Sequence, residues 1–288
     1  MDVRGGESHP LHRPRWCAPS GASPPPPPEP IDASVSGPYP GTEKNPPANI
    51  VWFPFSDPLS NGASGIPQNT NAAQFIADAW GIANNTGLCG EVAISAILRA
   101  ILGDVSVQDV VDNYLDAIRN SEIVGHNPGD LDPNYTGPGE LQQFIDKRYG
   151  DVLDVELPLW WPHWIEDFQA YQWRTEPGKV RDLVRGWLEA NQFSIAGVET
   201  VNGSSGSERG GWVGDTARPN RIRILHWVVI AGISLQFDRQ NAMSRWNWFR
   251  IYNPFDNQTE YSWFPHFMQA REAGGNFSVV AGRQVKDG

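Results

Sequence analysis

The sequence predicts an α+β fold, in which a helical N-terminal half with a buried central helix packs on a C-terminal antiparallel β-sheet. Two observations favour this class: apolar residues at helical spacing come first along the chain, and strand-like runs come afterwards. A third is the absence of an internal repeat, which argues against a solenoid or propeller. The length of 288 residues and an apolar content of 40% are compatible with a globular core in one or two domains.

The first 48 residues are expected to form a disordered, proline-rich tail, and residues 49–288 a single folded domain. The tail contains SPPPPPEP at 23–30. Proline tracts form extended polyproline II without a packed core, so a solvated tail is the first expectation and a spacer or a ligand for a proline-binding module is the alternative. Cys17 lies in this tail, where no structural partner is expected.

An almost unbroken apolar run from Val92 to Leu102 predicts a helix that begins at Cys89 and stops at Gly103. Apolar residues around most of its circumference predict burial on nearly all sides. Cys89 would then lie at the positive end of the helix dipole, which lowers the pKa of a thiol and favours the nucleophilic thiolate. Free cysteines are also among the most buried residues, so packing alone is the better interpretation of Cys89 taken by itself.

The remaining elements follow from periodicity and turn residues. Ordered sequence is expected to begin near residue 50, and Ser106 is placed to cap the helix that follows it. Clusters of Gly, Pro and Asn predict loops, whereas β-branched and aromatic runs predict strands. We expect helices at 72–80, 107–120, 140–149 and 177–190, loops at 60–71, 125–139 and 202–215, and strands at 193–198, 222–234, 246–252, 260–264 and 277–281.

Composition excludes several functions. A formal net charge of −11 argues against a broad basic surface for nucleic acid, and no apolar run is long enough to span a bilayer. With only two cysteines and no HExxH spacing, neither a metal nor another cofactor is expected, and His126, His163 and His266 are weak candidates for any site. The N-terminus as written lacks the apolar segment of a secretory signal, so a cytoplasmic location is the default expectation.

Two later residues provide what a catalytic cysteine needs. His226 interrupts a row of aliphatic residues in the strand RIRILHWVVIAGI, and Asn253 ends an apolar row in the next strand. Taken singly, His226 is a core histidine and Asn253 a turn residue before Pro254. Together, in the order Cys, His, Asn, they supply a nucleophile, a base and a group that fixes the imidazole tautomer.

Three motifs contain these residues: GLCGEVAI at 87–94, LHWVVIAGI at 225–233 and IYNPFDNQTEYSWFPHF at 251–267. They resemble the motifs of papain-like cysteine peptidases, nearest to the bacterial C39-like branch. The resemblance implies a papain-like fold with Cys89 as nucleophile, His226 as general base and acid, and Asn253 as the orienting residue. It also implies that the backbone amide of Cys89 donates to the oxyanion, and that Phe255 shields the bond between His226 and Asn253.

The second oxyanion donor is where the chain departs from the family pattern. The family usually has Gln or Asn six residues before the cysteine, and Ala83 occupies that position here. Asn85 and Asn84 are the candidates for this donor if the loop is shortened. Turn formation is the alternative role for both.

The activity that the resemblance implies is acyl transfer, with a peptide or isopeptide bond cleaved through a thioester on Cys89. The expected partner is a peptide or protein substrate. Two alternatives stay open: a transglutaminase-like transfer of the acyl group to an amine, and a catalytically idle papain-like binding module. Trp160, Trp161 and Trp212 are candidates to line a cleft, although core packing fits them equally well.

Overall fold

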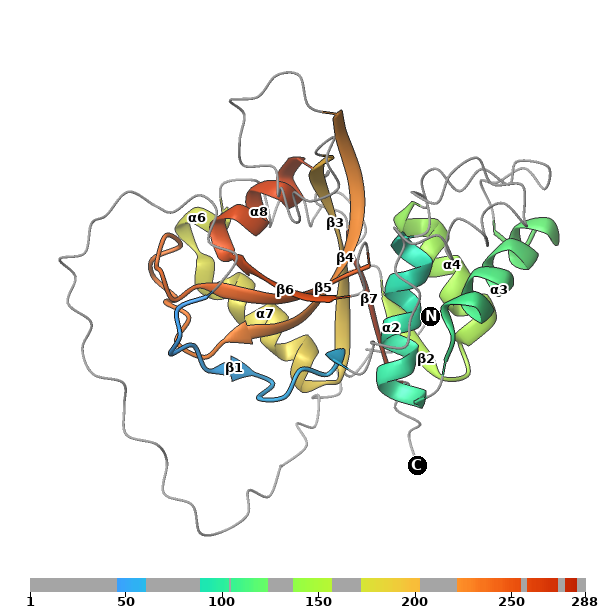
Figure 1. Cartoon of the computed structure of the whole chain (residues 1–288), viewed down its shortest axis with the longest axis horizontal. Helices are drawn as coiled ribbons and strands as arrows, with labels where there is room; N and C mark the ends of the chain where they lie inside the picture. Colours follow the sequence, from blue (N-terminus) through green and yellow to red (C-terminus); the bar gives the residue numbers. More distant parts are fainter. Residues whose placement is uncertain are drawn as a thin grey trace, which may run out of the picture. The chain divides into compact units, whose positions relative to one another are not determined.

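The computed structural model describes residues 46–60, 89–103, 105–123, 137–156, 172–202, 222–254, 258–273 and 278–283 (Figure 1). All of them lie within one compact unit, Thr42–Gly288. This unit combines helices with an antiparallel sheet, and its apolar helix α2 (Cys89–Leu102) packs against that sheet. The predicted α+β class is therefore confirmed, and the arrangement agrees with the papain-like description.

The sheet has seven strands among the described residues, in the order β2-β7-β3-β4-β5-β6, with β1 paired to β4. Every pairing is antiparallel, and β4 lies between β3 and β5. The predicted strands carrying His226 and Asn253 are thus immediate neighbours. The strands are β1 (Trp52–Phe53), β2 (Leu153–Glu156), β3 (Gln192–Asn202), β4 (Ile222–Ser234), β5 (Trp248–Asn253), β6 (Gln258–Trp263) and β7 (Ser278–Arg283).

Helices lie on both sides of the central strands. In Figure 1, α2, α3 (Val107–Arg119) and α4 (Pro138–Tyr149) lie on one side of β3 and β4, and α6 (Gln172–Thr175), α7 (Pro177–Glu189) and α8 (Phe264–Ala273) lie on the other. Helix α2 packs against β3, β4 and β7, and α7 packs against β3 and β4. Every residue from 226 to 234 is consequently buried. A strand covered on both faces reads as a continuous apolar run, which explains the sequence of β4.

Helix α2 is buried from its first residue, as predicted. Residues 89–99 are all buried, including the polar Ser95 and Arg99. Each of these polar groups has a local partner: the Ser95 hydroxyl donates to the Val92 carbonyl at 2.7 Å, and the Arg99 guanidinium donates to the Val105 carbonyl. Buried polar groups with partners avoid a large desolvation penalty, so an apolar helix can include them.

Helix α3 begins as the sequence predicts. The Ser106 hydroxyl accepts a hydrogen bond from the Asp109 backbone amide at 3.0 Å, which is an N-cap. On the buried face, the Tyr114 ring meets Phe144 of α4 edge to face with centroids 5.0 Å apart. The predicted apolar positions are buried together: Val107, Val110, Val111, Tyr114, Leu115 and Ile118.

An aromatic cluster fixes α8 against the sheet. Phe264, the first residue of α8, contacts Phe249 of β5 with ring centroids 5.6 Å apart, and Phe267 contacts the same Phe249 at 5.1 Å. Trp173 of α6 and Phe237 meet Phe264 edge to face. These rings bury large apolar areas, so their packing on Phe249 fixes the position of β5, the strand that ends at Asn253.

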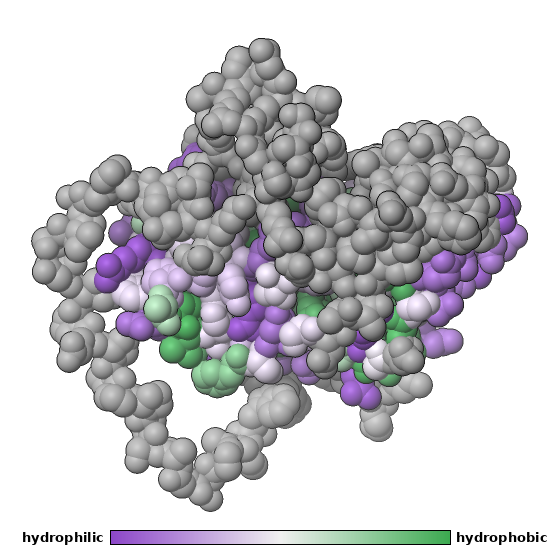
Figure 2. Space-filling model, in the orientation of Figure 1, coloured by the Kyte–Doolittle hydropathy of each residue, from purple (hydrophilic) through white to green (hydrophobic). Residues whose placement is uncertain are grey.

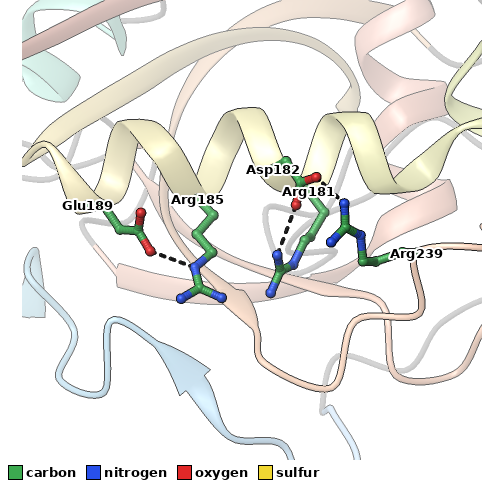
Figure 3. A network of polar contacts seen from close by, with 5 residues as sticks. All are labelled: Arg181, Asp182, Arg185, Glu189 and Arg239. Carbon is green, nitrogen blue, oxygen red and sulfur yellow. Dashed lines mark hydrogen bonds and ion pairs between the residues drawn. The ribbon is translucent and has the colours of Figure 1, made fainter. Parts of the chain in front are cut away.

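A polar network connects α7 to the segment between β4 and β5 (Figure 3). Asp182 of α7 pairs with Arg181 and with Arg239, and Arg185 pairs with Glu189 one turn further on. The Gly178 amide donates to the Arg239 carbonyl at 3.1 Å, and a Cβ on Gly178 would lie 3.0 Å from that oxygen. Exposed ion pairs contribute little stability each, so this network chiefly sets the position of the connecting segment.

The first described segment, residues 46–60, packs against β4 and β5. Trp52 and Phe53 pair with the last residues of β4. Arg250 of β5 donates to the carbonyls of Pro54 and Ser56 at 3.3 and 3.0 Å, and its guanidinium lies 5.1 Å from the Trp52 ring centroid. These contacts hold residues 52–56 against β4 and β5.

Three elements depart from the expected order of helices first and strands second, and the first is β1, which precedes every described helix. Strand β2 lies in the helical half, where the LDVE segment alternates apolar and polar residues over four positions, which is the shortest pattern that indicates a strand. Helix α8 begins at Phe264, so the strand expected at 260–264 ends at Trp263 instead. Pro265 in the first turn of α8 is compatible with a helix start.

Several expectations fall outside the described residues. These are the tail up to residue 45 with Cys17, the helix at 72–80 and most of the loops at 60–71, 125–139 and 202–215. The division into a tail and one folded domain therefore stays a prediction.

Exposed apolar residues are scattered over the described surface. The large ones are Val51, Phe55, Leu102 and Met243, which come from the N-terminal segment, the end of α2 and the segment between β4 and β5. On the face in Figure 2, green hydrophobic areas are small and lie among purple and pale ones. Single exposed apolar residues are normal for a folded domain. Among the described helices, none has the length and apolar content needed to cross a membrane.

Candidate functional site

The structure brings His226 and Asn253 together. The Nε2 atom of His226 lies 2.8 Å from Oδ1 of Asn253, and both side chains are more than nine-tenths buried. The two residues come from adjacent strands, β4 and β5, whose pairing includes Val229 opposite Tyr252. In a region closed to solvent, such a hydrogen bond holds the imidazole in a fixed orientation.

A second hydrogen bond defines the direction of the Asn253 amide. Its Nδ2 donates to the Glu260 carboxylate on β6 at 3.1 Å. Because a carboxylate only accepts, the NH₂ end of the amide belongs on the Glu260 side and the oxygen on the His226 side. Oδ1 can only accept as well, so His226 carries its proton on Nε2 and leaves Nδ1 as the basic nitrogen.

Cys89 is the first residue of α2 and is 5% exposed. Its thiol is hydrogen-bonded to the backbone of Trp227, the residue that follows His226 in β4. The thiol therefore lies beside β4. A Cβ built on Gly90 would lie 2.8 Å from Leu141 Cδ2 and 3.6 Å from the Trp227 ring. The glycine therefore lets the start of α2 approach both α4 and β4 closely.

The cysteine and the histidine are not hydrogen-bonded in this structure. Among the described contacts, the Cys89 thiol has backbone partners, and the His226 ring has Asn253. The structure thus brings His226 and Asn253 together and places Cys89 next to Trp227, the residue that follows His226.

Burial dominates the acid–base properties of the site. Burial, the largest cause, and the nearby charge of Glu91 together raise the pKa of the Cys89 thiol to about 12, against the lowering effect of the Trp227 hydrogen bond. Burial also lowers the pKa of His226 to about 4, although the bond with Asn253 opposes this. The expectation that the helix dipole favours a thiolate is therefore wrong for this buried state, because desolvation outweighs the dipole. Thiol and imidazole are both neutral at pH 7.

Of the other candidate residues, His266 is the one that the structure describes, and no contact with His226, Asn253 or Cys89 is described for it. His266 lies in α8 with its ring edge to face with Trp263, and burial lowers its pKa. Within the described ranges, no cluster of His, Cys, Asp or Glu could hold a metal ion. The remaining predicted residues lie outside those ranges: Asn84, Asn85, Phe255, Trp160, Trp161, Trp212, His126 and His163.

Sequence reasoning missed two acidic residues at the site. Glu260 contacts Asn253 from β6, and Glu91 is buried in the first turn of α2, close enough for its charge to act on the thiol. The signal for Glu260 was present, because an acidic residue in the strand after the Asn strand lies within reach of it. Glu91 directly precedes the apolar run that begins at Val92, and nothing in its spacing distinguishes it.

Among the solved structures that the chain resembles, the likeness is distant. A crystal structure from Bacillus anthracis that carries the provisional description of a C39-like peptidase is 14% identical, with a TM-score of 0.37. The match covers 70% of this chain and 90% of that one. No protein-family model matches the chain, and neither does any curated protein. A likeness this distant says nothing about activity, so the chemistry of the site rests on its own side chains.

Proposed function

We propose that the chain is a cysteine peptidase that cleaves peptide or isopeptide bonds through Cys89, His226 and Asn253. The observation that carries the proposal is the buried hydrogen bond of 2.8 Å between His226 Nε2 and Asn253 Oδ1. It leaves Nδ1 as a base of defined orientation on the strand that also contacts the Cys89 thiol. A nucleophile beside an oriented base is the arrangement that acyl transfer requires.

In the proposed reaction, Nδ1 of His226 takes the proton of the Cys89 thiol as Sγ attacks the substrate carbonyl carbon. The backbone amides at the start of α2, which have no acceptor within the helix, stabilise the oxyanion. The imidazolium then gives its proton to the leaving amine as the C–N bond breaks, and a thioester remains on Cys89. Water, deprotonated by Nδ1, attacks the thioester and releases the acid and the thiol.

Because the resting pair is neutral, we expect the proton transfer to occur in the substrate-bound state. A thiol with a pKa of about 12 does not protonate an imidazole with a pKa of about 4 in the buried site. The transfer becomes favourable only when the developing oxyanion is stabilised and the imidazolium is paired. The Cys89 side chain also has to come within hydrogen-bond reach of Nδ1, and hydrogen bonds of this kind often tighten only when substrate binds.

The test is digestion of a diverse peptide library by the full chain, with new termini identified by mass spectrometry. The matched control is Cys89→Ser, which keeps the size of the side chain but removes the thiol. Cleavage by the wild type and none by the variant supports the proposal. Adding a primary amine to the same assay separates hydrolysis from acyl transfer, because transfer yields an amide in place of a new carboxyl terminus.

A second candidate is a papain-like fold used for binding, with Cys89 idle. The observation in its favour is that both reactive groups are buried in neutral form, without a hydrogen bond between them. A thiol-directed peptide electrophile separates the two: covalent capture at Cys89 that depends on His226 supports the enzyme, and its absence supports the binding module.

A further inference from the structure

Three polar side chains form a continuous row across β4, β5 and β6. His226 contacts Asn253, and Asn253 contacts Glu260, with donor–acceptor distances of 2.8 and 3.1 Å. In the pairing of β5 with β6, Ile251 lies opposite Glu260, so Asn253 and Glu260 are diagonal neighbours two residues apart. Residues two apart in a strand share a face, which explains why the two side chains meet.

We propose that Glu260 is a positioning residue, whose carboxylate holds the Asn253 amide with its oxygen toward His226 and so sets the imidazole tautomer. An Asn amide has an acceptor end and a donor end that differ little in shape. Without an acceptor at position 260, the amide can turn over and present Nδ2 to His226. The ring would then accept at Nε2 and carry its proton on Nδ1, which removes the base that faces away from Asn253.

The position of Glu260 is itself fixed by its surroundings. Thr259, the preceding residue of β6, donates its hydroxyl to the Asp57 carboxylate at 2.5 Å. Asp57 belongs to the segment that Arg250 also binds, through the carbonyls of Pro54 and Ser56. Strand β6, the last strand in the order of the described sheet, is thereby tied to residues 46–60, and Glu260 is held at the register where it meets Asn253.

The experiment measures the His226 tautomer directly, by nitrogen-15 NMR of the full chain with labelled histidine. The chain has six histidines, so the spectrum of His226→Gln assigns the signal. We compare the wild type with Glu260→Gln, which keeps an acceptor oxygen, and Glu260→Met, which fills the same space without one. The expected result is a proton on Nε2 in the wild type and in Glu260→Gln, and a shift of the population toward Nδ1 in Glu260→Met.

The control is Thr259→Val, which removes a neighbouring hydrogen bond of β6 but leaves Glu260 in place. A tautomer that stays on Nε2 in Glu260→Met overturns the proposal. An equal shift in Thr259→Val also overturns it, because the effect would then come from loosening of β6 rather than from the carboxylate.

A kinetic measurement extends the test and rests on the proposed function. In Glu260→Met, kcat should fall by about tenfold or more with KM unchanged, because a wrong tautomer affects the base and not the binding of substrate. Glu260→Gln should restore most of kcat. If the wild type has no peptidase activity but the tautomer depends on position 260, the positioning role stands and the proposed function fails.

Discussion

Asn253 Oδ1 lies 2.8 Å from His226 Nε2, across two neighbouring strands and with both side chains buried. This bond makes Nδ1 the only basic nitrogen of the ring and fixes the direction in which it points. The two residues therefore have different roles in the proposed reaction: His226 moves the proton, and Asn253 orients the ring.

These different roles predict different losses of kcat/KM when His226 and Asn253 are replaced. His226→Ala removes the base, so kcat/KM should fall by about 10²- to 10⁴-fold. Asn253→Ala leaves the base in place but frees its tautomer, so the loss should be smaller. The measurement is kcat/KM for both variants on one peptide substrate. A larger loss for Asn253→Ala than for His226→Ala would mean that the amide acts directly on the substrate.

The buried imidazole predicts a loss of stability in acid. In the folded chain the pKa of His226 is about 4, below the ordinary value of 6.5, so the unfolded chain binds the proton first as pH falls. The stabilisation is complete above pH 6.5 and is lost between 6.5 and about 4. It amounts to on the order of 3 kcal/mol. The measurement is the free energy of unfolding in urea, for the wild type and His226→Gln, over this pH range. The wild type should lose more stability in acid than the variant does, by that amount. An equal loss in both proteins would contradict the burial of His226.

The buried Cys89 thiol predicts a loss of stability at alkaline pH. Its pKa rises from 9.0 to about 12 on folding, so the unfolded chain releases the proton first as pH rises. Stability from this group is complete below pH 9 and is lost between 9.0 and about 12. The same unfolding measurement on Cys89→Ala should show a shallower alkaline decline than the wild type. A decline as steep as that of the wild type would show that the thiol is not buried in solution.

Burial also predicts slow chemical modification of Cys89 in the resting protein. With Cys17 replaced by serine, iodoacetamide at pH 7 should label the folded chain far more slowly than the urea-unfolded chain, because the folded thiol is neutral and 5% exposed. Intact-mass analysis over time gives both rates. Labelling that is faster in the folded chain would show a preformed thiolate and reverse the interpretation of the pKa.

The cap of α3 predicts a local stability effect that is independent of function. Ser106→Ala removes the acceptor for the Asp109 amide and should destabilise the chain by about 1 kcal/mol. Ser106→Thr keeps a hydroxyl and is the control. Equal unfolding midpoints for Ser106→Ala and the wild type would show that water replaces the cap without cost.

Much of the fold could be predicted from the sequence because its signals are local. The apolar run of α2, the serine before α3 and the β-branched run of β4 each determine their element within about 15 residues. Helix α8 could not, because Tyr261 to Phe264 reads as an aromatic strand, and the packing of Phe264 and Phe267 on Phe249 of β5 is visible only in the structure. Strand β2 likewise forms through pairing with β7, far away in sequence.

The site shows the same division. Chemical type and chain order identify His226 and Asn253, because an imidazole and an amide in apolar strands require partners. The protonation state of Cys89 could not be predicted from helix position alone, since desolvation depends on what surrounds the thiol in space. An acidic residue in the strand after Asn253 was a signal for Glu260, but its contact with Asn253 depends on the pairing register of β5 with β6, which the sequence does not show.

The central claim is that His226 activates Cys89 for acyl transfer, and the rate of acylation tests it most directly. A chain with Cys17→Ser is mixed with peptide p-nitrophenyl esters at pH 7, and acyl adducts are followed by rapid-quench intact mass and peptide mapping. The account predicts an adduct on Cys89 that is absent in Cys89→Ala and forms about a hundredfold or more slowly in folded His226→Ala. Equal acylation rates in the wild type and His226→Ala, or an adduct on another residue, would contradict it.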